Sequence, residues 1–355
     1  MRRSFLLASL GVAFAASSAC TTILGIGDPQ LDPGTGGSTG SGGGGAATGG
    51  GPGSGGGGSP PLPCTPDPTA CPAADLECLA LRDNAGLDRF GLRVQQMTIF
   101  KPDAFVSGLE YTAITQALTM NLPSCYLAGG GTINLLVEMD RAAGMATIGG
   151  AKPVADPFDG YSFASEMVEV SPGVFYDVSP KSVAAVVEPN GMFSTSEIGA
   201  VTLPLYLDQA GTSVILMPIH EARAFDVQLS NSQNCVGTFN AGELDPGKGC
   251  LPELNKDIKS FVEGGKLDGY VSLEEADEIV VTAYGLNRTL CVVLAQDVGE
   301  FGTGSNPTRC ARKTDGSIKF PGDWCAATNS PADPSCSDAA RFFVSFAASG
   351  VTIKP

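Results

Sequence analysis

The pattern of apolar and polar positions after residue 130 is mainly that of short β-strands. Apolar or alternating runs are separated by turn sequences such as Ser171-Pro172-Gly173, and within 224–229 apolar and polar residues alternate. Such alternation indicates a strand with one buried and one solvated face. Strands are predicted at 132–138, 167–170, 174–178, 182–188, 198–207, 213–219, 224–229, 290–295 and 342–353. Strands at this spacing favour a mostly β domain, an antiparallel β-sandwich or jelly-roll-like fold.

Four other segments have helical spacing. Segments 72–82 and 109–120 each predict a short helix. Apolar residues also repeat at helical spacing within 254–262, and Ser272-Leu273-Glu274-Glu275 matches a capping box. The last two signals together predict a helical hairpin near 252–284, inserted between strands.

The first 63 residues are typical of an export signal followed by a tether. The basic pair Arg2-Arg3 precedes an apolar run of about a dozen residues, shorter than the roughly 20 that span a bilayer. Residues 1–19 are therefore predicted to be a signal peptide. From 34 to 58 the chain is mostly glycine, which cannot bury a core and behaves as a flexible coil. We expect a disordered linker over 20–63 and a disulfide-stapled, β-rich domain over 64–355.

The end of the signal contains a candidate lipidation site. Ser17-Ser18-Ala19-Cys20 resembles a bacterial lipobox, in which the cysteine becomes the lipidated first residue of the mature protein. The resemblance implies a membrane anchor at Cys20, since several acyl chains together give stable anchoring. Thr21, in place of aspartate, implies sorting to the outer membrane. Ser17 departs from the pattern, where an aliphatic residue is usual, so plain signal cleavage after Ala13-Phe14-Ala15 is the alternative.

The net charge argues against nucleic acid as a partner. The chain carries 21 basic and 37 acidic residues, a formal charge of −16. Removal of residues 1–19 takes away Arg2 and Arg3 and no acidic residue, which makes the charge −18. Phosphate binding needs a basic surface. Nucleic acid is therefore not expected as a partner. The expected partners are the membrane, through the lipid anchor, and an unknown protein or glycan ligand.

The cysteines predict a disulfide framework. Besides Cys20 there are ten, an even number, which in an exported chain indicates paired cysteines. They are Cys64, Cys71, Cys78, Cys125, Cys235, Cys250, Cys291, Cys310, Cys325 and Cys336. The absence of a C-x-x-C motif and the single histidine argue against a structural zinc site. The expected local pair is Cys235–Cys250, and the cysteines at 310, 325 and 336 are expected to staple segment 301–338.

Segment 264–275 resembles an EF-hand calcium loop. Asp268, Gly269, Ser272 and Glu275 fall at positions where that loop has ligands or its glycine. Gly264 and Lys266 stand at the first and third ligand positions, so two ligand side chains are missing. The preferred interpretation is a metal-free turn between the two predicted helices. Calcium is the alternative, with Asp268, Ser272 and Glu275 as weak candidate ligands and no other cofactor.

Catalytic signals are sparse. His220 is the only histidine, and without a second histidine or a nucleophile elbow nearby it is interpreted as structural. Two catalytic-looking motifs within 36–45 lie in the glycine-rich tether, without the strand and helix that give such motifs meaning. A glycosidase needs two carboxylates at a suitable separation. The candidates are Asp156, Asp159, Glu166, Glu169, Glu188 and Asp226. Trp324 is expected to pack against a neighbouring disulfide, with sugar stacking as the alternative.

The whole chain resembles glycine-tethered, cysteine-rich lipoproteins of predatory soil bacteria such as the myxobacteria. The resemblance is carried by Ile23-Leu24-Gly25-Ile26 after Cys20, the glycine-rich spacer, Asn234-Cys235-Val236-Gly237 and segment 264–270. It implies an anchored envelope protein and brings no activity or site residues. Because the sequence has one histidine and no metal-binding or nucleophile motif in a structured context, the chain is expected to be a non-catalytic binding or structural module. The alternatives are a secreted hydrolase using two carboxylates and a calcium-dependent adhesion module.

Overall fold

The computed structural model describes residues 64, 67–71, 78–106, 108–253, 258–282, 287–295 and 308–355. The predicted signal peptide, Cys20 and the glycine-rich tether lie outside these residues. Contacts divide the chain into Met1–Gly58 and Ser59–Pro355, and every described residue belongs to the second unit. Within the described segments, no helix has both the length and the apolar character needed to cross a membrane.

One large antiparallel sheet forms the framework. Ten strands follow one another in the order β10-β11-β16-β21-β1-β4-β5-β8-β9-β12, and β13, β19 and β20 join at the side. The bounds along this path are β10 Ala200–Tyr206, β11 Val214–Phe225, β16 Gly265–Ser272, β21 Ala339–Val351, β1 Arg89–Lys101, β4 Asn134–Asp140, β5 Met145–Ala151, β8 Lys181–Val187, β9 Met192–Thr195 and β12 Val227–Gln228. The joining strands are β13 Cys235–Val236, β19 Trp324–Cys325 and β20 Ser330–Pro331.

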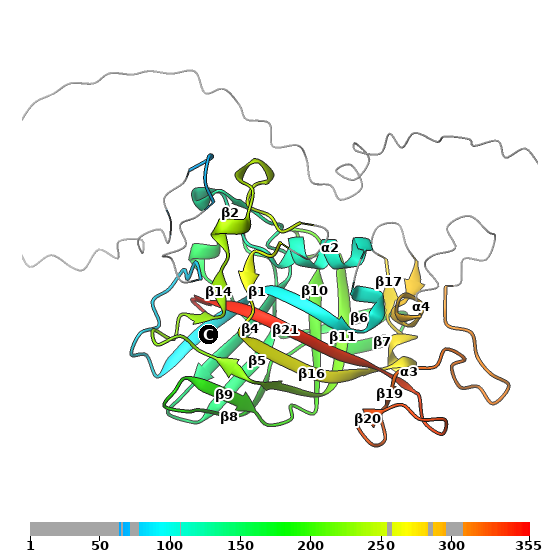
Figure 1. Cartoon of the computed structure of the whole chain (residues 1–355). Helices are drawn as coiled ribbons and strands as arrows, with labels where there is room; N and C mark the ends of the chain where they lie inside the picture. The colour runs from blue at the N-terminus through cyan, green and yellow to red at the C-terminus, as the bar shows by residue number, and fades with distance from the viewer. Residues whose placement is uncertain are drawn as a thin grey trace, which may run out of the picture. The chain divides into compact units, whose positions relative to one another are not determined.

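The first and last long strands meet at the centre of this sheet. β1 and β21 pair from Gly91↔Val351 to Lys101↔Phe343, and β16 pairs with the other edge of β21. Figure 1 shows the red strand β21 between the cyan strand β1 and the olive strand β16. The first and last long strands of the described residues are thus paired at the middle of the sheet, which makes the fold depend on contacts between residues far apart in sequence.

The sheet curls so that strands distant in its order approach one another. β5 lies near β10, and β9 lies near β11. At the first of these contacts a Cβ added to Gly150 would lie 2.6 Å from Cδ of Pro204. A side chain at Gly150 would therefore force the two layers apart. The curl encloses the larger core, whose fully buried members include Leu92, Val344 and Ile219.

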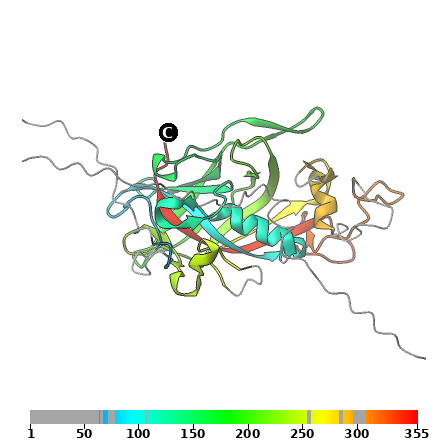
Figure 2. The same cartoon turned by 90° about the horizontal axis from the view of Figure 1, so that it is seen from above.

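Short elements cover the ends and edges of the sheet. Pairs of small strands are β2 Asn121–Leu122 with β3 Leu127–Ala128, β6 Met167–Ser171 with β7 Val174–Asp177, β14 Thr238–Phe239 with β15 Phe261–Val262, and β17 Val280–Val281 with β18 Arg288–Thr289. The helices are α2 Gly108–Leu118, α3 Leu273–Ala276 and α4 Leu290–Leu294, with 3-10 turns η1 Asp103–Phe105, η2 Pro123–Cys125, η3 Pro157–Asp159, η4 Ala241–Glu243 and η5 Pro246–Lys248. Seen from above in Figure 2, α2 lies over β1, and the green β6–β7 hairpin reaches outward.

Five disulfides connect the ten downstream cysteines. The pairs are Cys64–Cys125, Cys71–Cys250, Cys78–Cys235, Cys291–Cys310 and Cys325–Cys336. The first three join the beginning of the described chain to three separate parts of the domain, and their sulfurs belong to the second core. Full pairing confirms the predicted framework and fits an oxidising, extracytoplasmic environment. The predicted pair Cys235–Cys250 is wrong, because each of these cysteines bonds to the N-terminal segment instead.

The mostly β, antiparallel fold with few short helices is confirmed. Helix α2, the β6–β7 hairpin and the long strand β21 lie where the pattern predicts them. The predicted helix at 72–82 falls partly outside the described residues, and its described part, 78–82, contains no helix.

Two local predictions are wrong. The helical hairpin near 252–284 is replaced by β15, β16 and the one-turn helix α3, with 254–257 outside the described residues. The predicted strand 290–295 is helix α4, all five residues of which are buried. A short apolar run that is buried on all sides has no alternation, so its period cannot distinguish a strand from a helix.

Candidate functional site

A set of aromatic and charged side chains lies on the outer face of the central strands β11, β16, β21 and β1. In β16 the residues Leu267 and Val271 pack into the large core, so Lys266, Asp268 and Tyr270 project from the opposite face. Cross-strand register brings Asp268 between Arg223 of β11 and Phe343 of β21. The same strand alternation that builds the core therefore also builds this outer face.

Arg341 of β21 occupies a central position on this face. Its guanidinium donates two hydrogen bonds to the carboxylate of Asp268, at 2.9 and 2.8 Å. It also lies over two rings, 4.9 Å from the centroid of Trp324 and 4.7 Å from that of Phe343. Hydrogen bonding to Asp268 raises the pKa of Arg341. A bidentate pair between two aromatic rings holds the cation in one orientation.

Three phenylalanines form a row across the strands. The ring of Phe343 lies 5.3 Å from that of Phe100 in β1 and 6.4 Å from that of Phe225 in β11, measured between centroids. Phe100 keeps 47% of its surface exposed, although aromatic side chains are usually well buried. An exposed ring held against a second ring is a contact surface available to a partner.

Cations and carboxylates surround this row. Arg223 and Lys266 lie 5.3 and 5.7 Å from the centroid of Phe225. Lys266 pairs with Asp226 at 2.9 Å, and Lys101 pairs with Asp323 at 3.1 Å and with Asp103 at 3.0 Å. We call this surface the cation–aromatic face. Its members are Phe100, Phe225, Phe343, Lys101, Arg223, Lys266, Arg341, Asp103, Asp226, Asp268 and Asp323.

His220 lies at one end of the cation–aromatic face, beside a β-bulge. Between His220 and Arg223 strand β11 has two residues opposite Gly269 of β16, and Glu221 adopts a φ of +48°. His220 is hydrogen-bonded through Nε2 to a carboxylate oxygen of Glu275, and its ring stacks on Tyr270 at 5.4 Å. This contact connects β11 to α3. The histidine is thus part of a structural hydrogen bond at the rim, as the sequence predicts.

The contact with Glu275 changes the pKa of His220. The hydrogen bond to Glu275 raises the pKa of His220 above 6.5, and burial opposes this shift. Because the pKa is raised on folding, the pair stabilises the fold fully below pH 6.5, and this stabilisation is lost as pH rises through the folded pKa. Since His220 is the only histidine, one imidazole signal in a proton NMR titration reports this value directly.

We expect the midpoint of the His220 titration to lie above 6.5 in the native protein and to fall in Glu275→Gln. The charge of Glu275 is what favours the imidazolium, and glutamine keeps the size of the side chain without that charge. Glu188→Gln is a control at an exposed carboxylate and should leave the midpoint unchanged. A native midpoint at or below 6.5 would contradict the structure of this pair.

The three candidate calcium ligands do not form a common site. Asp268 binds Arg341, Glu275 binds His220, and Ser272 lies opposite Ala339 in the β16–β21 ladder. The resemblance to an EF-hand is therefore wrong in structure, because 265–272 is a strand. Position 269 needs glycine for a reason unrelated to calcium. An added Cβ would lie 2.7 Å from Cγ2 of Ile219 and 2.8 Å from the His220 carbonyl oxygen.

The candidate glycosidase carboxylates lie on several elements, with Asp156 and Asp159 together at η3, and all six are exposed. Asp156 accepts from the Phe158 amide in η3, Glu166 pairs with Lys152 at 2.9 Å, and Glu169 accepts from the Gly173 amide at the hairpin turn. Asp226 pairs with Lys266 on the cation–aromatic face. Asp159 and Glu188 lie at the exposed η3 and β8–β9 turns. These contacts are those of solvated turn and surface residues.

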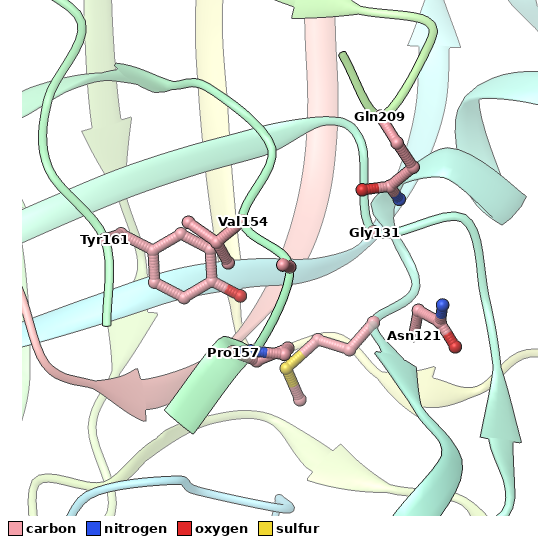
Figure 3. Close-up of a pocket in the computed structure, with 8 residues that line it drawn as sticks. Asn121, Gly131, Val154, Pro157, Tyr161 and Gln209 are labelled. Atoms are coloured by element: carbon pink, nitrogen blue, oxygen red, sulfur yellow. The ribbon is translucent and has the colours of Figure 1, made fainter. Parts of the chain in front are cut away.

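The two best-formed hollows of the described residues are small. One, shown in Figure 3, is surrounded by Tyr161, Val154, Asn121 and Gln209 and has a volume of about 20 Å³. This is room for about one water molecule. The other, beside Arg141 and 185–187, has about 210 Å³. Ligand pockets usually measure about 300–1,000 Å³, so the cation–aromatic face is the better candidate for a functional site.

Trp324 is the only predicted site residue with a defined role on this face besides Asp226 and Asp268. It is 9% exposed, and its indole N–H donates to Asn329 at 3.0 Å. Its ring packs with Tyr270 and Ala339, and the neighbouring Cys325 bonds to Cys336. The Trp324 ring packs against the Arg341 guanidinium and offers little surface to a ligand.

The remaining members of the face are not identifiable as site residues from the sequence. A signal is nevertheless present, because apolar and polar residues alternate in Lys266-Leu267-Asp268-Gly269-Tyr270-Val271-Ser272. That period of two predicts a strand with a polar outer face.

No protein-family model, no curated protein and no solved structure matches this chain.

Proposed function

We propose that this protein is an extracytoplasmic binding module, held to the outer membrane by lipid at Cys20, and that it binds its partner through the cation–aromatic face. The five disulfides support export to an oxidising compartment. The glycine-rich tether that follows Cys20 gives a module the reach to meet a partner away from the membrane. The role is one of binding, without catalysis.

The observation that carries this proposal is the aromatic row, exposed at Phe100 and half-buried at Phe225 and Phe343, with its ordered cations. Phe100 is 47% exposed, and Arg341 is fixed by Asp268 and two rings. The strands beneath are interior strands of the sheet, so the surface is rigid before any partner arrives. Rigid aromatic and arginine groups dominate binding energy in protein interfaces. They contribute more when no ordering is needed on binding.

The lipid anchor is tested by changing Cys20 to serine. We expect Cys20→Ser to appear in the soluble fraction and to lose incorporation of a labelled fatty acid, because the acylated thiol is absent. Ser17→Leu is the matched control, since it brings the sequence nearer to the lipobox and should stay membrane-bound and labelled. Membrane retention of Cys20→Ser would remove the anchor from the proposal.

The binding surface is tested with two exposed arginines. The full-length Cys20→Ser chain is mixed with isolated envelopes of the producing cells, and bound protein is measured after sedimentation. We expect Arg223→Glu, on the cation–aromatic face, to weaken binding by at least about tenfold. Arg141→Glu makes the same charge change at an exposed site elsewhere and should leave binding unchanged. Equal binding by both variants would contradict the proposed surface.

A further inference from the structure

We propose that the partner of the cation–aromatic face is a neutral polysaccharide. This inference rests on the proposed function and specifies the ligand class of the same surface. Three features of the described structure select it: the shape of the surface, its balance of charge and the kind of hydrogen-bonding groups that it offers.

The shape favours a polymer over a small molecule. The two best-formed hollows in the described segments measure about 20 and 210 Å³, and the cation–aromatic face lines neither. A small ligand on an open face buries too little of its own surface to bind well. A chain molecule that lies across several strands gathers its contacts from many repeating units.

The charges select a neutral ligand. The face has four cations and four aspartates, and Lys101, Lys266 and Arg341 are each paired with one or two of these carboxylates. A polyanion would find no surplus of positive charge here and would meet a chain whose formal charge is −16. A polycation would be attracted to the acidic residues elsewhere on the chain as strongly as to this balanced surface.

The hydrogen-bonding groups favour a sugar over a peptide strand. β16, at the middle of the face, is paired on both sides, with β21 along its whole length and with β11 from Lys266 to Asp268. A peptide cannot extend the sheet at β16, because that mode of binding needs an unpaired strand edge. The ion pairs Arg341–Asp268 and Lys266–Asp226 instead present fixed donors beside fixed acceptors. A hydroxyl group both donates and accepts, and therefore suits such pairs.

The aromatic row supplies the apolar part of the contact. A sugar ring carries hydroxyls at its edge and C–H groups on its faces, and the latter pack on an aromatic ring. Phe100, 47% exposed and supported by Phe343 at 5.3 Å, is the ring most open to such packing. Lys101 follows Phe100 in the chain and forms ion pairs with Asp103 and Asp323. Polar and apolar contacts are therefore available side by side.

The test uses the full-length Cys20→Ser chain in sedimentation with insoluble cellulose, chitin, mannan and mixed-linkage β-glucan. Alginate and polygalacturonate gels serve as acidic probes. We expect binding to at least one neutral polymer that changes less than twofold between 50 and 500 mM salt, since no net charge is neutralised. Phe100→Ala should weaken this binding at least tenfold, and Phe100→Trp should retain it.

Phe175→Ala is the matched control, because Phe175 is a similarly exposed phenylalanine, at 53%, on the β6–β7 hairpin away from the face. It should bind as the parent does. The melting temperature of each variant is measured, and only variants that melt at the temperature of the parent are compared, so that loss of binding is separated from loss of fold.

The outcomes separate this inference from the proposed function. Binding only to acidic polymers, with steep salt dependence, overturns the neutral ligand and leaves the face as the binding surface. Failure of every polysaccharide, while Arg223→Glu still weakens envelope binding, likewise overturns the ligand class alone. Unchanged envelope binding by Arg223→Glu, together with no polysaccharide bound, overturns both proposals.

Discussion

Replacement of both Cys78 and Cys235 by serine is expected to lower the free energy of unfolding by about 3 kcal/mol. The two cysteines are 157 residues apart, but the intact Cys71–Cys250 disulfide already joins the same two parts of the chain, so this crosslink closes a ring of about 22 residues, 7 between 71 and 78 and 15 between 235 and 250. The chain-entropy model assigns about this stabilisation to such a ring. Urea unfolding followed by circular dichroism, in buffer that keeps the other disulfides oxidised, measures the difference.

The structure indicates where this loss begins. Cys78 opens a segment that lies against the end of β21, where the Ser349 hydroxyl donates to the Cys78 carbonyl at 2.5 Å. Further along, the amides of Leu81 and Arg82 donate to the Gly350 carbonyl at 2.8 and 3.2 Å. Without the disulfide the segment loses its covalent link to Cys235 and is held by these hydrogen bonds, by that of the Asn84 amide to Asn234 and by the burial of Leu79 and Leu81. Hydrogen exchange at Leu81 and Arg82 should therefore accelerate before that of β1.

The control is the disulfide Cys325–Cys336, which closes a loop of only 11 residues. Its replacement by two serines should also cost about 3 kcal/mol or less. It should leave hydrogen exchange at Leu81 and Arg82 as in the parent, because this crosslink lies at β19 and not beside that segment. Equal acceleration at Leu81 and Arg82 in the two double variants would show that the Cys78–Cys235 disulfide has no local effect.

Sequence period predicts local elements well where one face is buried and the other is wet. The β6–β7 hairpin is predicted because Ser171-Pro172-Gly173 fixes the turn between two alternating runs. β16 has the same period, but Asp268 and Gly269 also suit a turn, and the prediction of a turn there is wrong. The glycine is needed because the bulge of β11 comes within 3 Å of its position, which is a constraint imposed by another strand.

The disulfide pairing and the cation–aromatic face share one reason for being unpredictable from sequence. Each joins residues that meet only once the strand order is known. Asp268 touches Arg341 because β16 lies beside β21, and Cys71 reaches Cys250 across 179 residues. Cysteine number predicts that pairs exist, whereas their partners depend on topology. A residue such as Phe100 becomes part of a surface only through Phe343 of the last strand.

A buried carboxylate near α3 should show the second large effect. Asp277 follows α3 and has no exposed surface. Its carboxylate accepts hydrogen bonds from the Thr289 hydroxyl at 2.9 Å and the Cys310 amide at 2.9 Å. It also forms ion pairs with Arg309 at 3.3 Å and Arg312 at 3.0 Å. This one side chain therefore joins α3, β18 and the chain around the Cys291–Cys310 disulfide.

Asp277→Ala is expected to lower the free energy of unfolding by about 3 kcal/mol. The change leaves the Thr289 hydroxyl and the Cys310 amide unpaired in the interior, and loss of one partner of a buried ion pair typically costs 3–5 kcal/mol. The lower end applies because the Arg309 and Arg312 side chains are 61% and 40% exposed, so water can solvate them after the change. Urea unfolding at pH 7 measures the loss.

Glu274→Ala is the matched control, since Glu274 lies three residues earlier and pairs with the same Arg312, but its side chain is 55% exposed. An exposed ion pair stabilises by at most about 1 kcal/mol, so this variant should be close to the parent. In the sequence Glu274-Glu275-Ala276-Asp277, nothing distinguishes the last carboxylate from its neighbours. Because only burial distinguishes them, equal stability of Asp277→Ala and Glu274→Ala would mean that the carboxylate of Asp277 is solvated and that α3 does not pack as the structure has it.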